Sequence, residues 1–187
     1  MSILFIVVLF ELTIKTINMK KIILSTVAIM AFGFANAQEG NFKLGAHIGL
    51  PIGDIEDAYS LNLGADVAYI WNVADKFNAG VTTGYSTYLA KTYTYNDGVN
   101  SVEIKGDAAG FIPVAAIGQY SLADNLFLCA DLGYAIYAGS GDGNGGFLYQ
   151  PKFGYQTEKI EFYAGYKGIS VDGGTFSSIN LGFNYKF

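Results

Sequence analysis

Residues 41–50 read Asn-Phe-Lys-Leu-Gly-Ala-His-Ile-Gly-Leu. The even-numbered positions are apolar, and the odd-numbered ones hold asparagine, lysine, histidine or glycine. Alternation with a period of two is typical of a β-strand, because successive side chains of a strand point to opposite faces of a sheet. This stretch therefore predicts a strand with one apolar face and one polar face.

The same alternation recurs along the chain, and no long window shows helical periodicity. The predicted strands are Asn41–Leu50, Ser60–Trp71, Phe77–Tyr88, Ala109–Tyr120, Leu126–Tyr137, Phe147–Tyr155, Ile160–Ile169 and Phe176–Phe187. The fourth is apolar on both faces, and its apolar outer face is assigned to Ile112, Val114, Ala116, Gly118 and Tyr120.

Charged residues within these strands all fall on the polar face. They are Lys43, Asp66, Asp131, Lys152, Glu161, Lys167 and Lys186. Acidic residues and lysines on one enclosed face predict either a plug of paired charges that fills the interior or a path for ions. Because an unpaired buried charge is costly, we favour the plug.

The connections alternate between long, polar segments and short turns. The long ones are 51–59, 89–108, 138–146 and 170–175, and the short ones are 72–76, 121–125 and 156–159. Trp71, Tyr120 and Tyr155 precede the short turns, as in an aromatic girdle. Together these features predict an all-β fold, an eight-stranded antiparallel up-and-down transmembrane β-barrel. An interior of this size is about wide enough for side chains to fill.

The first 37 residues are expected to be an export signal. Residues 19–21 open a basic segment, residues 22–34 form a 13-residue apolar run, and Ala35 and Ala37 precede Gln38. This order is that of a signal peptide at 19–37, cleaved before Gln38, and the run is too short for a spanning helix. Residues 1–18 are either translated from a mis-assigned start or an extension of the signal. The barrel domain is then 38–187.

Composition excludes several functional classes. The chain has one Cys, one His, no Arg and a net charge of −5, so a disulfide framework, a multi-histidine metal site and a nucleic-acid partner are not expected. Removal of residues 1–37 takes away three lysines and one glutamate, which leaves eight lysines, 15 acids and a net charge of −7. No cofactor is predicted.

The sequence motifs that could indicate a catalytic or ligand-binding site are weak evidence for one. Residues 141–146 match the G-x-G-x-x-G motif of dinucleotide-binding sites. Such a site needs a helix after the motif, but the residues that follow have the pattern of a strand. We therefore favour a flexible loop over a nucleotide site, and also over a calcium site formed by Asp142 and Asn144. His47 with Ser86 suggests a hydrolase only if a third group orients the histidine. We expect His47 to fill the lumen, Cys129 to be a buried small side chain, and the protein not to be an enzyme.

Several stretches resemble a known family. They are Gln38 after Ala35-Asn36-Ala37, Gly49-Leu50-Pro51-Ile52-Gly53-Asp54, Leu63-Gly64-Ala65-Asp66-Val67-Ala68-Tyr69, Ala130-Asp131-Leu132-Gly133-Tyr134-Ala135 and Asn180-Leu181-Gly182-Phe183-Asn184-Tyr185-Lys186-Phe187. The chain resembles the OmpA/OmpX-like eight-stranded outer-membrane proteins, and most closely the outer-membrane β-barrel domain proteins typical of Bacteroidetes. The resemblance implies the outer membrane of a Gram-negative bacterium, contact with its lipid, and recognition of Phe183, Tyr185 and Phe187 by the barrel-assembly machinery.

Three functions remain open. The leading hypothesis is a non-enzymatic outer-membrane barrel with a structural or surface-interaction role, whose extracellular loops, mainly 89–108, meet an unknown partner. The first alternative is a narrow pore or transport barrel. The second is a secreted lipocalin-like binder of an apolar ligand, in which the two faces are reversed. Acidic residues in the loops are expected to form a solvated outer face.

Overall fold

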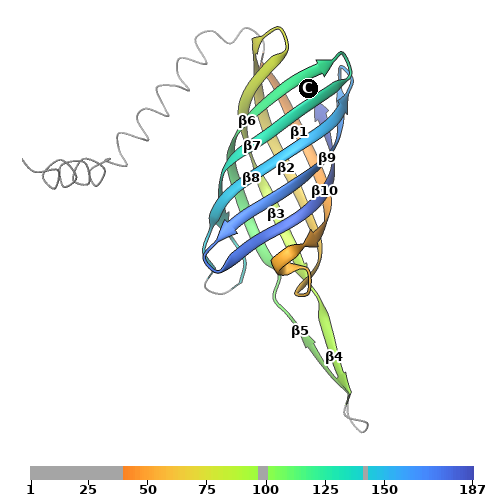
Figure 1. Ribbon diagram of the computed structural model, residues 1–187, viewed down its shortest axis with the longest axis vertical. Coiled ribbons are helices and arrows are strands. Elements are labelled where there is room, and N and C mark those ends of the chain that lie inside the picture. Colours follow the sequence, from red (N-terminus) through yellow and green to blue (C-terminus); the bar gives the residue numbers. More distant parts are fainter. Residues whose placement is uncertain (1–39, 97–100, 141–142) are drawn as a thin grey trace, which may run out of the picture. The chain divides into compact units, whose positions relative to one another are not determined.

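A computed structural model describes residues 40–96, 101–140 and 143–187. Antiparallel strands close into a barrel in the order β1-β10-β9-β8-β7-β6-β3-β2 (Figure 1). The barrel strands are β1 (Gly40–Ile52), β2 (Tyr59–Ala74), β3 (Phe77–Ala90), β6 (Ala109–Ala123), β7 (Leu126–Tyr137), β8 (Gly146–Gln156), β9 (Ile160–Val171) and β10 (Gly174–Lys186). The eight-stranded antiparallel barrel predicted from the sequence is therefore confirmed.

Each predicted strand is present, with both ends within three residues of the expected positions. The predicted signal peptide at 19–37, its cleavage site at Ala35, Ala37 and Gln38, and residues 1–18 lie outside the described residues. A 3-10 turn, η1 (Gly53–Ile55), follows β1. In the three described ranges, no helix is both long and apolar enough to cross a bilayer.

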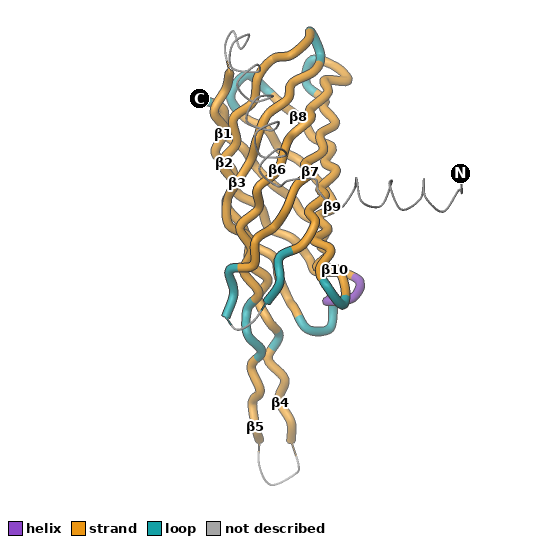
Figure 2. Tube along the Cα trace, turned by 90° about the vertical axis from the view of Figure 1, so that its left-hand side faces the viewer, coloured by secondary structure: helices purple, strands orange, loops and turns teal. Residues whose placement is uncertain are grey.

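Two of the four long connections differ most from the prediction. The segment 89–108 contains a hairpin of β4 (Thr92–Asn96) and β5 (Ser101–Lys105), which pair with each other and lead away from the end of the barrel (Figures 1 and 2). The connection expected at 170–175 shortens to Asp172 and Gly173, because both strands continue into it. Gly173 has a φ of 93°, a left-handed conformation that glycine adopts without a steric penalty.

The two faces of the wall have the predicted polarity. Leu50 and Leu181 are more than 60% exposed on the outside, whereas Lys43, Glu161 and Lys167 are at most 4% exposed inside. In β6 the assigned parity is correct, because Ile112 and Val114 lie outside and Phe111 is fully buried. Phe111 is apolar but inward because it packs into a cluster at the loop end of the lumen.

Inside the barrel, large side chains lie over glycines of the next strand. Across one row of paired positions, His47 covers Gly64, Tyr163 covers Gly182 and Phe127 covers Gly154. A Cβ at Gly182 would lie 2.1 Å from the Tyr163 ring. The inner glycines therefore make room for the large groups that fill the narrow interior.

Gly182→Ala is expected to destabilise the barrel by about 1–3 kcal/mol, because the added methyl group overpacks the site. The measurement is the urea midpoint followed by the fluorescence of Trp71, the only tryptophan. Gly118→Ala is the matched control, since its Cβ would make ordinary 3.5 Å contacts with Phe77. Equal midpoints for the two variants would contradict the packing argument.

Candidate functional site

At the turn end of the lumen, Glu161 gathers two lysines. Lys43 Nζ lies 2.6 Å from Glu161 Oε1, and Lys186 Nζ lies 3.9 Å from the same oxygen. Asn184 Nδ2 donates to Glu161 Oε2 at 3.0 Å, and Lys43 also donates to Gln119 Oε1 at 2.8 Å. Both carboxylate oxygens of this buried glutamate are therefore bonded.

A second pair joins neighbouring strands β7 and β8. Lys152 Nζ lies 2.6 Å from Asp131 Oδ2 and 5.1 Å from the centre of the Tyr163 ring. Cys129 is buried beside it, with Sγ 3.6 Å from Asp131 Oδ1. This is the inward position expected for Cys129.

The third cluster is built around His47. Its Nδ1 lies 2.6 Å from Asp66 Oδ2, and its Nε2 lies 2.8 Å from Lys167 Nζ. A protonated lysine can only donate, so Nε2 accepts and Nδ1 carries the hydrogen that goes to Asp66. Neutral His47 thus connects a buried cation on β9 with a carboxylate on β2.

Ser86 joins the same cluster, so serine, histidine and aspartate do converge, which sequence reasoning did not expect. Ser86 Oγ lies 3.4 Å from His47 Nε2. Lys167, however, occupies that nitrogen at the shorter distance, and Ser86 Oγ also accepts from Asn62 Nδ2 at 2.9 Å. A hydrolase needs the histidine lone pair free to take the serine proton. The hydrogen bonds here fix Ser86 rather than activate it.

The seven predicted lumen charges lie in three hydrogen-bonded clusters. Glu161 holds Lys43 and Lys186, Asp131 holds Lys152, and Asp66 reaches Lys167 only through His47. Sequence reasoning placed His47 on the correct face but missed its bridging position, because that depends on which strands meet across the lumen. A cavity of about 30 Å³ between the clusters has room for about two waters.

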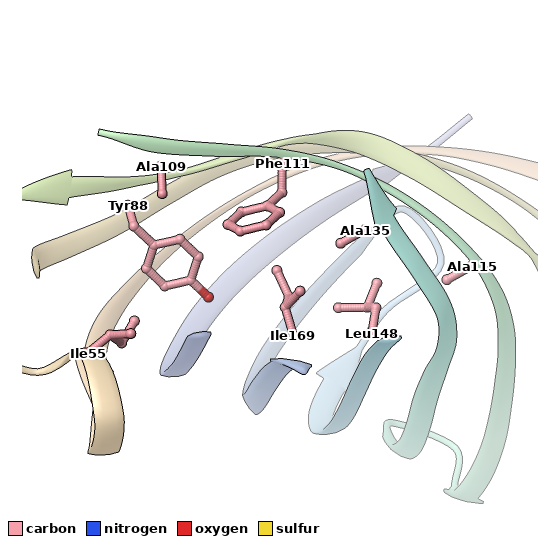
Figure 3. Close-up of a cluster of buried hydrophobic side chains, with 8 residues drawn as sticks. All are labelled: Ile55, Tyr88, Ala109, Phe111, Ala115, Ala135, Leu148 and Ile169. Atoms are coloured by element: carbon pink, nitrogen blue, oxygen red, sulfur yellow. The ribbon is translucent and has the colours of Figure 1, made fainter. Parts of the chain in front are cut away.

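On the loop side of these clusters, apolar side chains fill the end of the lumen. Figure 3 shows Tyr88, Phe111, Leu148 and Ile169 projecting from four different strands into one space. Phe176 packs against Phe111 and Tyr88 with ring centres 5.0 and 5.4 Å apart. We call the residues of Figure 3 together with Tyr59, Tyr137, Val171 and Phe176 the aromatic cluster.

The connections at the loop end of the barrel are rich in acidic residues, and hydrogen bonds join some of them to one another. Asp54 Oδ2 accepts from the backbone N–H of Thr175 at 3.0 Å, which attaches η1 to the start of β10. Lys91 Nζ donates to the backbone oxygen of Glu56 at 2.7 Å, and the Tyr93 hydroxyl donates to that of Asp57. These bonds hold the base of the β4–β5 hairpin against the β1–β2 connection.

The glycine-rich loop is followed by β8, as its pattern predicts, although residues 141 and 142 lie outside the described part. The described residues contain no group of three or more histidine, cysteine, aspartate or glutamate side chains placed to hold a metal ion.

Aromatic side chains line the outer wall near both ends. Tyr120 and Tyr155 are each 47% exposed near the short turns, and Trp71 lies half-buried there, edge-on to Tyr69. A second set, which sequence reasoning did not single out, lies in the loop halves of the strands and consists of Tyr85, Tyr134, Phe147, Tyr149 and Tyr166. Their positions on the outer face of the strands, close to the long connections, could have indicated this second set from the sequence.

The C-terminal aromatic residues lie on the outer face of β10 and just beyond it. Phe183 packs against Phe162 with ring centres 5.2 Å apart, and Phe187 packs against Tyr185 at 4.9 Å and Phe42 at 5.9 Å. The final strand is therefore fixed to both of its neighbours.

No family model matches the chain, and no curated protein sequence matches it. Several solved structures, however, are similar to it. A de novo designed transmembrane β-barrel aligns with a TM-score of 0.50 at 12% identity, over 81% of this chain and 99% of the design. The designed barrel TMB2.3 also gives 0.50 at 12% identity, over 79% of this chain and 94% of the design.

A natural protein aligns equally well. Ail, the attachment invasion locus protein of Yersinia pestis, in complex with the heparin analogue sucrose octasulfate, gives a TM-score of 0.50 at 14% identity, over 80% of this chain and all of Ail. The fold is that of a small transmembrane β-barrel. At this level of identity the likeness extends to the fold alone.

Asp131→Ala is expected to destabilise the barrel by about 3–5 kcal/mol, because Lys152 loses its partner while still buried. Replacement of both residues, Asp131→Leu with Lys152→Met, is expected to recover most of the loss, since no charge is then left alone. Urea midpoints of the two variants in the same detergent test this. An undiminished midpoint for Asp131→Ala would show that the pair contributes no stability.

Proposed function

We propose that this protein is a non-enzymatic outer-membrane β-barrel of a Gram-negative bacterium that acts at its loop end. The observation that carries the proposal is the filled lumen. Ion pairs occupy the half of the lumen near the short turns, and the aromatic cluster occupies its loop end, so the barrel itself offers no wide passage. The hairpin β4–β5 and the acidic connections around it are then the surface left for a partner.

The polarity of the wall supports a membrane location over the lipocalin-like alternative. A secreted barrel for an apolar ligand would hold apolar residues inside, whereas the middle of this lumen holds His47, Lys167 and Asn180. The outside carries a continuous set of exposed leucines, isoleucines and aromatic residues, which in water would be a large apolar patch. A lysine on this face at the bilayer midplane would cost about 2–4 kcal/mol, and the four lysines of the barrel strands, Lys43, Lys152, Lys167 and Lys186, point inward.

Export and insertion belong to the same proposal. Residues 19–37 would direct secretion with cleavage before Gln38, and Phe183, Tyr185 and Phe187 would be read by the barrel-assembly machinery. Membership of the OmpA/OmpX-like group, and of its Bacteroidetes type, rests on the sequence stretches given above. The extracellular partner is of unknown identity.

The hydrogen bonds around Ser86 favour a structural role over hydrolysis. Lys167 donates a hydrogen bond to His47 Nε2, and the Ser86 side chain is buried on the turn side of the aromatic cluster. A substrate would have to enter a lumen that side chains fill.

Surface labelling of single-cysteine variants tests the topology. Thr94→Cys lies in β4, and Glu158→Cys lies in the β8–β9 turn, both at exposed positions. A membrane-impermeant maleimide is expected to label Thr94→Cys on intact cells, and Glu158→Cys only after the outer membrane is opened. The unmodified chain is the control, because its one cysteine, Cys129, is buried. Labelling of Glu158→Cys alone on intact cells would reverse the topology, and recovery of the chain in the soluble periplasmic fraction would refute the membrane location.

Planar-bilayer recordings separate the surface role from the pore alternative. The purified wild-type chain is expected to give no stable single-channel steps, because the aromatic cluster fills the lumen. Asp131→Ala should behave in the same way, since it removes an ion pair and leaves that cluster intact. Recurrent steps of one amplitude from the wild-type chain would favour a narrow pore.

A further inference from the structure

A row of small residues crosses the outer wall of the barrel in the half near the short turns. Its members are paired from strand to strand across β3, β6, β7 and β8, and they are Ala79, Gly118, Ala130 and Pro151. All of them have the outward parity of their strands, which faces the bilayer. The wall is therefore low along this row.

Large side chains border the small row on both sides. On the turn side they are again paired from strand to strand, and they are Phe77, Tyr120, Leu128 and Phe153. On the loop side, Leu132 on β7 pairs with Tyr149 on β8. The small row is thus the floor of a groove, which forms an open hollow of about 530 Å³.

The groove has the width of one hydrocarbon chain. Its two borders lie four residues apart along each strand, or about 13 Å between backbones, and their own side chains occupy most of that distance. An α-helix, with a diameter of about 10–12 Å, is too wide to reach the floor. A second barrel would touch the borders with its own convex wall and leave the floor uncovered. The outward side chains of the hollow are apolar apart from the Tyr120 hydroxyl, which suits an acyl chain.

The turn-side border lies at the level of the lipid headgroups. Tyr120 belongs to the aromatic set near the short turns, and such residues mark the membrane–water interface of barrels. Lys76 precedes Phe77 and has an exposed side chain, and its backbone oxygen accepts from the N–H of Ser121 at 2.8 Å. Lys76 is therefore held between two border strands. The exposed Asp75 precedes it, so both signs of charge are present there.

We propose that this groove binds one acyl chain of a phospholipid with a zwitterionic headgroup, from the leaflet that meets the short turns. The chain lies over Gly118 and Ala130, while Lys76 pairs with the phosphate and Asp75 with the ammonium group. Bulk lipid is as apolar as the groove, so the preference for the site comes from close packing of the chain and from the headgroup contacts. The site rests on the membrane location proposed above, and it is separate from the loop end.

Native mass spectrometry of the barrel extracted from membranes in mild detergent tests the site, with phosphatidylethanolamine as the probe. The wild-type chain is expected to retain one lipid. Ala130→Leu is expected to bind it about tenfold more weakly, because the larger side chain takes the place of the acyl chain on the floor. Ala65→Leu is the matched control, since Ala65 is an exposed outward alanine of β2 outside the hollow. Equal retention by the two variants would overturn the proposal.

The headgroup contacts are tested with Lys76→Gln. This variant is expected to bind phosphatidylethanolamine about threefold more weakly and to bind a diacylglycerol, which has no phosphate, as the wild-type chain does. A dimer that Ala130→Leu abolishes would assign the groove to a second copy and refute the lipid site. A barrel that stays in the membrane fraction but retains no lipid would refute this site alone, whereas a soluble wild-type chain would refute the membrane location itself.

Discussion

The pairing of the first and last barrel strands is the contact on which the rest of the molecule depends. β1 and β10 pair in an unbroken register from Lys43 with Lys186 to Ile52 with Ser177. Closure removes the free edges of the sheet, which hydrocarbon cannot solvate, and each unpaired backbone group there would cost several kcal/mol. With eight strands, closure also leaves an interior that side chains must fill. The polarity of the outer wall and the packing of the lumen both follow from this requirement.

The lumen meets the requirement in layers of different chemistry. Apolar side chains fill the loop end, where the strands lead into long connections. Ionic clusters share the remainder with a second group of buried side chains that includes Ile117, Phe127 and Tyr163. The ion pair of Lys43 with Glu161 joins positions 118 residues apart in the chain, and the link of Lys167 with His47 joins positions 120 apart. Such bonds are satisfied in one register only, because a slip of one residue would turn these side chains toward the outer face. The buried charges therefore specify the barrel as well as filling it.

The sequence alone was sufficient to predict the strands and their faces, because a closed wall between apolar and polar surroundings enforces a period of two. It also predicted that Phe111 points inward, because Ile112 and Tyr120 were assigned to the outer face and Phe111 precedes Ile112 in the strand. It did not predict β4 and β5, which are only five residues each and are exposed at Thr92, Tyr93, Thr94 and Glu103. The bridge from Asp66 through His47 to Lys167 was also out of reach, because it joins β2, β1 and β9 and depends on the strand stagger. Proximity across the lumen is a property of barrel closure and leaves no local mark on the sequence.

The His47 cluster shows that the proximity of serine, histidine and aspartate is weak evidence for catalysis. Whether the histidine lone pair is free to accept a proton is stronger evidence. Serine, histidine and aspartate lie within reach of one another, yet a lysine donates to the nitrogen that would have to accept the serine proton. The same lysine stabilises the barrel, because its charge is balanced, through a neutral ring, by a carboxylate three strands away. The lysine that occupies the histidine lone pair thus also links the three strands of the cluster. With the interior committed to stability in this way, the acidic loop end is the part of the molecule free to vary, and recognition is best sought there.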